Sequence, residues 1–452
     1  MFKKILLTGV AVGSIVAATS AAQAGAFGLR EQSAAGQGMS FAGAAANGAG
    51  LGSMFWNPAT ITDYQGIQAS ATGSLILPYA KLTNQAGSGP TYTSLSAAGA
   101  SSSSGNEGLA ALVPSGYLSW QINDQFWAGL SVNAPFGLGT KPEATWSGRD
   151  YNSTTSITSL NVAPTIAYKF NEMFSIAGGV NFISLKAKYT SALPATGNPY
   201  PSTWSVLGMQ GDGTAWGFNL GATFKPTSTT EIGVGYRSGM SVKVDGDFFG
   251  YAADPTKNKP VKTTIPLPQS INVGVKQKIN AELTLLGGLE WTDWSVLQAP
   301  SVTYAASGVQ HELLKTIPFY YKDGWYASLG AEYKWNSNLT LRTGLGYEWT
   351  PVRDAERSAR LPDNDRLWTS AGLSYKFNEQ LNMDFGYTHI FPKSTMVTID
   401  ANNHNRNPNL AASGLDTLIT KVDSHIDIVS LGLTYRFDTP TSSTRLPGKV
   451  TK

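Results

Sequence analysis

The stretch LNVAPTIAYKF, residues 160–170, sets the fold class of this chain. Every second residue is apolar or aromatic, and the residues between them are small, polar or cationic. This period of two is typical of a β-strand with one face in an apolar environment and the other in water. The apolar face ends with Tyr168 and Phe170, whereas Lys169 lies on the face in water.

The same strand ending occurs four times: YKFN at residues 168–171 and 375–378, YKWN at residues 333–336 and YRFD at residues 435–438. Strands of transmembrane β-barrels have a lipid face, a wet lumen face and aromatic residues at the membrane interface. A soluble sandwich also alternates, but it does not repeat an aromatic pair at its strand ends. The sequence therefore predicts an all-β, antiparallel transmembrane β-barrel.

The composition agrees with this prediction. Charged residues make up 14% of the 452 residues, whereas ordinary soluble domains contain about 25%. Beyond the N-terminus no run of 18 apolar residues occurs, which excludes helical membrane spans of the usual length. The chain has no cysteine, which excludes disulfides and thiolate metal sites.

Residues 1–24 are predicted to be a cleaved export signal. Lys3 and Lys4 precede an apolar stretch, and Ala22-Gln23-Ala24 forms a cleavage site. Removal of this segment leaves one more basic than acidic residue, a balance that argues against nucleic-acid binding. The expected location is the bacterial outer membrane.

About fourteen strand candidates lie within residues 64–437, and twelve is the alternative count. Their connections alternate between short and long, as in outer-membrane barrels. The short ones, assigned to the periplasmic side, are residues 123–124, 171–172, 227–228, 280–281, 336–337 and 378–379. The long ones, assigned to the extracellular side, are residues 81–108, 137–156, 191–213, 250–262, 298–323, 351–365 and 393–423.

Residues 25–63 do not alternate and are rich in Ala and Gly. Apolar residues such as Phe27, Phe41 and Trp56 are costly to leave in water. We therefore expect this segment to fold into the lumen as a small hatch rather than to remain a disordered leader.

Several motifs in their order resemble the outer-membrane long-chain fatty acid transporter (FadL) family, which includes relatives for aromatic hydrocarbons. They begin with Gly25-Ala26-Phe27 and the hatch motif Asn57-Pro58-Ala59, and continue with WTDWS at residues 291–295 and LPDNDRLW at residues 361–368. The resemblance implies a fourteen-stranded barrel closed by the hatch. It also implies passive uptake of hydrophobic molecules through an apolar tunnel, with lateral exit into the bilayer at a kink in the third strand. Phe27 matches the ligand-facing tip of the family's hatch.

The third predicted strand contains Pro135, which cannot donate a hydrogen bond to its neighbour. Pro114 and Pro164 lie in the strands on either side. Pro135 is therefore a candidate for a break in the wall, which the three neighbouring prolines together favour; alternatively, Pro135 by itself only ends the strand at the extracellular rim.

A fatty acid requires a cation for its carboxylate, and Arg suits this role. Strand alternation predicts that four charged residues face the lumen and lie near a ligand: Lys322, Arg342, Glu348 and Arg366. Alternatively, they neutralise one another or anchor the hatch.

The connection at residues 191–213 is unusually apolar, which often indicates a binding surface. We expect it to capture ligand from outside; alternatively, it packs on other loops. The residues concerned are Leu193, Tyr200, Trp204, Leu207 and Met209.

The four histidines form no catalytic or metal-binding spacing, so we expect neither an enzyme nor a cofactor or metal. The remaining alternatives are a hydrocarbon channel, a general diffusion porin for small polar solutes, and a structural barrel. The expected partners are a hydrophobic small molecule, outer-membrane lipid and lipopolysaccharide, and the barrel is expected to be a monomer. Residues 438–452 form a polar tail, predicted to be disordered in the periplasm.

Overall fold

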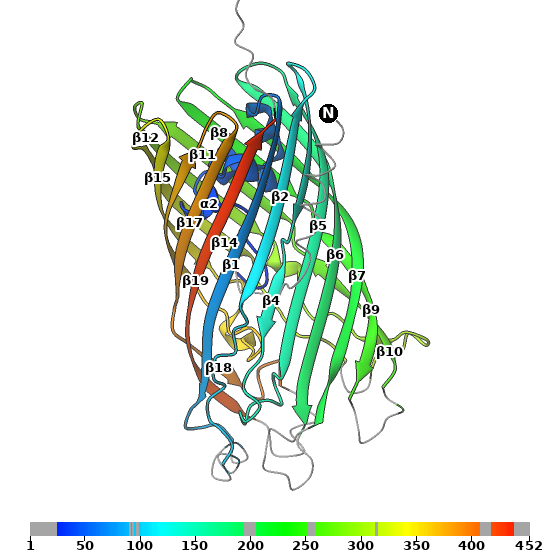
Figure 1. Cartoon of the computed structure of the whole chain (residues 1–452). Helices are drawn as coiled ribbons and strands as arrows, with labels where there is room; N and C mark the ends of the chain where they lie inside the picture. Colours follow the sequence, from blue (N-terminus) through cyan, green and yellow to red (C-terminus); the bar gives the residue numbers. More distant parts are fainter. Residues whose placement is uncertain are drawn as a thin grey trace, which may run out of the picture.

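The computed structural model shows a closed antiparallel β-barrel (Figure 1). It describes residues 25–89, 92, 95, 99–193, 205–250, 256, 258–311, 315–406 and 417–437. The predicted export signal and C-terminal tail lie outside the described residues. The barrel closes between its first and last strands, because β1 (Ile67–Asn84) pairs along its length with β19 (Leu418–Arg436).

The described residues form fourteen barrel strands, as predicted, when each interrupted strand is counted once. The interrupted strands are β3/β4, β8/β9, β10/β11 and β17/β18, and β13 is a short addition beside β10. The remaining bounds are β2 Ala111–Gln121, β3 Phe126–Asn133, β4 Gly137–Thr140, β5 Thr154–Lys169, β6 Phe174–Leu193, β7 Ser205–Phe224, β8 Thr230–Arg237, β9 Met240–Phe249, β10 Pro260–Leu267, β11 Ser270–Lys278, β12 Leu283–Thr292, β13 Thr303–Tyr304, β14 Gly324–Lys334, β15 Leu339–Trp349, β16 Arg366–Lys376, β17 Leu381–Pro392 and β18 Thr395–Ile399.

All six predicted short turns join neighbouring strands. In the turn between β5 and β6, Asn171 Oδ1 accepts hydrogen bonds from the backbone N–H groups of Met173 and Phe174. The same arrangement closes four further turns, at Asn123, Asn280, Asn336 and Asn378. The repeated strand ending therefore combines an aromatic pair for the membrane interface with an asparagine for the turn.

Five of the long connections are shorter than predicted, because strands extend into them, whereas the connections predicted at residues 298–323 and 351–365 are slightly longer and span residues 293–323 and 350–365. β6 runs to Leu193 and β7 begins at Ser205, so the expected connection at residues 191–213 is reduced to residues 194–204, which lie outside the described part of the chain. The start of β7 is rich in Gly, which hides the strand pattern. Pairing with β6 and β9 nevertheless fixes its register.

The two faces of the wall differ as expected. Leu329 of β14 and Leu345 of β15 are 72% and 59% exposed on the lipid side. Their neighbours on the other face, Ser328 and Gly344, are buried. Among the described residues, no helix is long and apolar enough to cross a bilayer.

The N-terminal segment, residues 25–66, lies inside the barrel close to the end with the short turns (Figure 1). It touches strands around the circumference: β16, β17 and β19 through α2, β8 and β11 through η1, and β5, β6 and β7 through η3. Its helices are α2 Ala34–Gln37, η1 Ala44–Ala46, η2 Gly50–Phe55 and η3 Pro58–Asp63; the loops add η6 Trp294–Val296 and η7 Asp354–Glu356.

Glycines in the wall allow this segment to lie against the strands. A Cβ atom at Gly344 of β15 would overlap the backbone of Met39, and one at Gly235 of β8 would overlap the backbone of Trp56. The close approach therefore requires glycine at these two positions.

Candidate functional site

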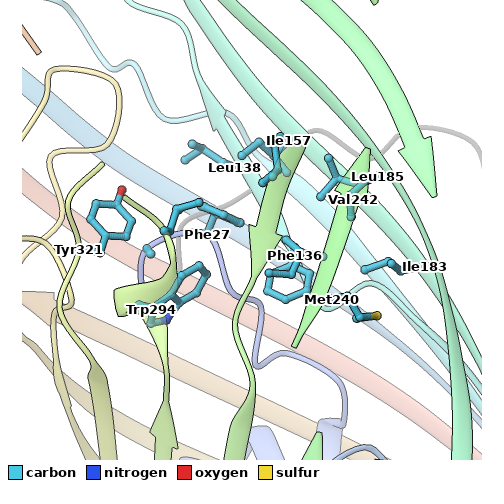
Figure 2. Close-up of a cluster of buried hydrophobic side chains, with 14 of the residues drawn as sticks. Phe27, Phe136, Leu138, Ile157, Ile183, Leu185, Met240, Val242, Trp294 and Tyr321 are labelled. Atoms are coloured by element: carbon cyan, nitrogen blue, oxygen red, sulfur yellow. The ribbon is translucent and has the colours of Figure 1, made fainter. Parts of the chain in front are cut away.

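Phe27 lies in an apolar cluster together with Phe136, Trp294 and Tyr321 (Figure 2). Its ring centroid is 4.8 Å from that of Trp294 and 5.9 Å from that of Phe136. Strands β4, β5, β6, β9 and β10 contribute aliphatic side chains to the same cluster. These side chains are Leu138, Ile157, Ile183, Leu185, Met240, Val242, Val244, Ile265 and Leu267.

The third barrel strand is interrupted at Pro135, next to Phe27. β3 ends at Asn133, and the strand resumes as β4 at Gly137. The N-terminal segment pairs with the interruption, since Leu29 N donates to Pro135 O and Gly137 N donates to Phe27 O, both at 2.8 Å. The strand thus continues beyond Pro135, and its interruption is tied to the tip of the N-terminal segment.

A small cavity of about 80 Å³ adjoins the apolar cluster. Its apolar lining includes Leu29, Phe55, Phe136 and Trp294. Its charged lining consists of two arginines and two glutamates: Arg30, Arg237, Glu290 and Glu348. Apolar and charged side chains therefore lie side by side around this cavity.

Arg30 of the N-terminal segment is neutralised by the barrel wall. Its guanidinium lies 2.7 Å from Glu290 Oε1 of β12 and 3.1 Å from Glu348 Oε1 of β15. The guanidinium also lies 3.9 Å from the centroid of the Tyr326 ring. Arg30 therefore anchors the N-terminal segment to the wall.

Arg237, at the end of β8, is bound by neutral groups. It donates to Asn181 Oδ1 at 3.1 Å and to the carbonyl oxygen of Phe55 at 3.0 Å, and it lies over the Phe55 ring. Within the described residues, no carboxylate lies at ion-pair distance from it. Sequence analysis missed Arg237, although the exposed Val234 and the strand alternation indicate that it faces inward.

The four charged residues predicted near a ligand are not brought together. Glu348 faces inward but is paired with Arg30. Arg366 is buried in an ion pair with Asp363, and Arg342 pairs with Glu332 at 2.8 Å towards the short-turn end. Lys322 precedes β14 and is exposed, outside the strand positions that face inward.

The Asn57-Pro58-Ala59 motif begins η3. Asn57 Oδ1 accepts a hydrogen bond from Ala59 N at 3.0 Å and caps this short helix, with Pro58 at its first position. The Asn57 Nδ2 group donates to the carbonyl oxygens of Ala45 and Ala222. The motif thus joins two parts of the N-terminal segment to strand β7.

The residues predicted to capture ligand at the surface are placed differently. Met209 is buried in β7 against Phe248, and Leu207 is half-buried in the same strand. Leu193 is the last residue of β6. Tyr200 and Trp204 lie outside the described residues.

The loops opposite the short turns contain buried carboxylates. Glu107 Oε2 accepts a hydrogen bond from Asn152 Nδ2 at 3.4 Å, and burial raises the pKa of Glu107 to about 8. Burial likewise raises the pKa of Asp150 to about 7. The closed loop arrangement therefore favours protonated carboxyl groups.

The chain is similar in sequence to known outer-membrane transport proteins. A family model described as "Outer membrane protein transport protein (OMPP1/FadL/TodX)" matches residues 15–437. The long-chain fatty acid transport protein of Escherichia coli K12 is 27% identical over 440 residues, covering 88% of this chain and 95% of the relative. Outer membrane protein P1 of Haemophilus influenzae Rd is 28% identical over 416 residues, covering 83% and 88%.

Two solved structures show the same fold. A FadL homologue of Pseudomonas aeruginosa has a TM-score of 0.78 at 24% identity, covering 92% of this chain and all of that chain. The toluene transporter TbuX of Ralstonia pickettii has a TM-score of 0.63 at 17% identity, covering 90% of this chain and 100% of that chain.

Among the described residues, no group of three or more potential His, Cys, Asp or Glu ligands could hold a metal ion.

Proposed function

This chain belongs to the OMPP1/FadL/TodX family of outer-membrane transport proteins, and we propose that it mediates passive uptake of hydrophobic molecules, most of all long-chain fatty acids. The barrel closes on itself through β1 and β19, which fits the expectation of a monomer. The E. coli relative is a long-chain fatty acid transport protein, and the Ralstonia relative is a toluene transporter. Both names describe hydrophobic cargo.

The observation that carries the proposal is the apolar cluster around Phe27 beside the buried Arg237. An alkyl chain gains free energy by leaving water for such a cluster. A fatty acid carboxylate gains a charge-assisted hydrogen bond from a guanidinium that forms no ion pair within the described part of the chain. Arg237 replaces the four charged residues of the sequence analysis as the candidate for this role.

The N-terminal segment is the proposed hatch. Its contacts around the circumference support a role in closing the lumen, and Asn57-Pro58-Ala59 anchors it to β7. Movement of its tip, residues 25–32, would open a path past Phe27. The body of the segment would stay seated against the wall.

The interruption at Pro135 is the proposed lateral exit. Among the described residues, the tip donates and accepts backbone hydrogen bonds at this point of the wall, and Ser159 Oγ of β5 bonds the N–H and the carbonyl oxygen of Phe136. Displacement of Phe27 and Leu29 would therefore leave the interruption held to β5 by the Ser159 side chain and would weaken the wall there. Ligand could then enter the bilayer without crossing a water-filled pore. A hydrocarbon such as toluene would use the same path without needing Arg237, which is the second candidate function.

Equilibrium binding of labelled oleate and oleyl alcohol to the purified protein tests the ligand class. Arg237→Met should weaken oleate binding about ten- to hundredfold, the equivalent of about 1.5–3 kcal/mol for a hydrogen bond to a charged group. Binding of oleyl alcohol should be nearly unchanged, and Arg237→Lys should restore part of the oleate affinity. Unchanged binding of both ligands in Arg237→Met would leave a site for neutral hydrocarbons. Equal weakening of both would show that Arg237 does not recognise the carboxylate, and binding of neither ligand by wild type would contradict the proposal.

A further inference from the structure

The barrel wall rises above the membrane in two places, at β1 and β19, with 18 and 19 residues, and around β6 and β7. β6 and β7 are each 20 residues long, whereas β12 has 10 residues and β14 has 11. A transmembrane strand needs about 9–11 residues. The far halves of β6 and β7 therefore project beyond the hydrocarbon on the extracellular side, opposite the short turns.

The outer surface around β6 and β7 changes from apolar to charged along its height. Its last large lipid-facing aromatics are Phe182 and Trp216, whose ring centroids lie 4.7 Å apart. Lys186 follows Phe174, at the short-turn end of β6, by twelve residues. At a rise of about 3.3 Å per residue and a tilt near 40°, this places Lys186 about 30 Å above the other interface, beyond an apolar band of about 25 Å.

Above the aromatics, charged residues form one continuous patch, here called the lysine–aspartate strip. One row of directly paired residues crosses four neighbouring strands: Lys186, Asp212, Asp245 and Lys262. Lys188, Lys243 and Asp247 extend it on either side. All seven side chains are exposed.

Most charges in this strip are not paired with each other. Lys262 lies 3.2 Å from Asp245, but the structure as described gives Lys186, Lys188 and Lys243 no ion pair. Asp212 and Asp245 face each other directly, an arrangement that destabilises a sheet unless something else binds them. Several charged side chains of the strip are therefore available to a ligand.

A groove crosses the strip. It has a volume of about 370 Å³. Its floor contains Gly211 and Gly246, which are directly paired, and its sides carry lysines and aspartates. The groove can therefore admit a polar group close to the backbone.

We propose that the lysine–aspartate strip binds the phosphorylated saccharide headgroup of lipopolysaccharide in the outer leaflet. Its height places it among headgroups, since the apolar band ends below it. The lysines suit phosphate groups, while Asp212, Asp247 and Gln210 can accept hydrogen bonds from sugar hydroxyls. With four lysines and three aspartates, the strip is complementary to an anionic ligand that also carries hydroxyl groups.

This binding is independent of the transported cargo, because every residue of the strip is on the outside of the wall. β12 and β14 carry no comparable extension: both end level with the exposed Trp325. The glycolipid would thus hold the barrel from one side, next to β6, β7, β9 and β10.

Native mass spectrometry of the detergent-solubilised protein, titrated with purified lipopolysaccharide, tests the proposal. The triple variant Lys186→Gln, Lys188→Gln, Lys243→Gln should bind at least about tenfold more weakly than wild type. A matched variant with three exposed lysines near the short turns replaced, Lys278→Gln, Lys334→Gln and Lys376→Gln, should bind like wild type. Oleate binding should be unchanged in both variants.

Two further ligands distinguish the chemistry. Removal of the phosphates from lipopolysaccharide should weaken its binding to wild type about as much as the triple substitution weakens binding of intact lipopolysaccharide. Phosphatidylglycerol at equal concentration should not compete with intact lipopolysaccharide for wild type. Unchanged binding of intact lipopolysaccharide by the triple variant would overturn the proposal, as would equal competition by phosphatidylglycerol. If the triple variant does not assemble, Lys188→Gln alone should still weaken binding measurably, and an unchanged affinity would again overturn it.

Discussion

Replacement of Arg30 by Met should detach the tip of the hatch from the barrel wall. The change removes two ion pairs, to Glu290 at 2.7 Å and to Glu348 at 3.1 Å, and leaves Glu348 buried without its cation. Breaking a buried pair by removing one partner costs about 3–5 kcal/mol. Because both pairs join residue 30 to strands β12 and β15, we expect this cost to fall on the tip rather than on the whole barrel.

Hydrogen exchange of the backbone amides in residues 25–33 measures this effect. A loss of about 3 kcal/mol corresponds to a local opening about a hundred times more frequent. Lys169→Met is the matched control, since the partner of Lys169, Glu172, is 90% exposed and such pairs contribute about 0–1 kcal/mol. Equal exchange of the tip in wild type and Arg30→Met would refute the reasoning.

Three further predictions concern the hatch and the loops. Gly344→Ala should destabilise the contact between the hatch and the wall by about 1–3 kcal/mol through overlap with Met39, measured as faster amide exchange in the hatch. Gly73→Ala is the control, because its new Cβ would lie at an ordinary contact distance of 3.6 Å from Leu112 Cδ1. Phe27→Ala should weaken oleate binding and leave the barrel assembled, as judged by circular dichroism. The raised pKa of Glu107 means that the folded loops bind its proton more tightly than the unfolded chain, so loop stability should be greatest below about pH 4.5 and should fall up to about pH 8. Proteolysis of the loops should accordingly increase with pH in wild type and less so in Glu107→Gln.

The barrel could be predicted from the sequence because its rules are local. A period of two fixes which face of a strand meets lipid, so Leu329 and Leu345 were assigned correctly. A turn-forming asparagine after an aromatic pair fixes where the chain reverses at three of the six short turns, at Asn171, Asn336 and Asn378. Neither rule needs knowledge of distant residues.

The interior could be predicted only in part, because it depends on contacts between distant segments. Strand alternation placed Glu348 and Arg366 inward, but it could not show that Arg30 and Asp363 pair with them. Arg237 was missed for a related reason: what distinguishes it is its neutral surroundings, which come from Asn181 and from the hatch. The sequence did not predict the first half of β7, because its residues show no clean alternation. Pairing with β6 places them in the strand.

Uptake by liposomes containing the purified protein tests the central claim most directly, with oleate, toluene and sucrose compared in wild type and in the double variant Phe27→Ala, Pro58→Ala. We expect wild type to admit oleate and to exclude sucrose, and we expect the double variant to lose selective oleate uptake. Toluene uptake without oleate uptake would place the protein with the hydrocarbon transporters. Free passage of sucrose through wild type would contradict a hydrophobic path closed by a hatch.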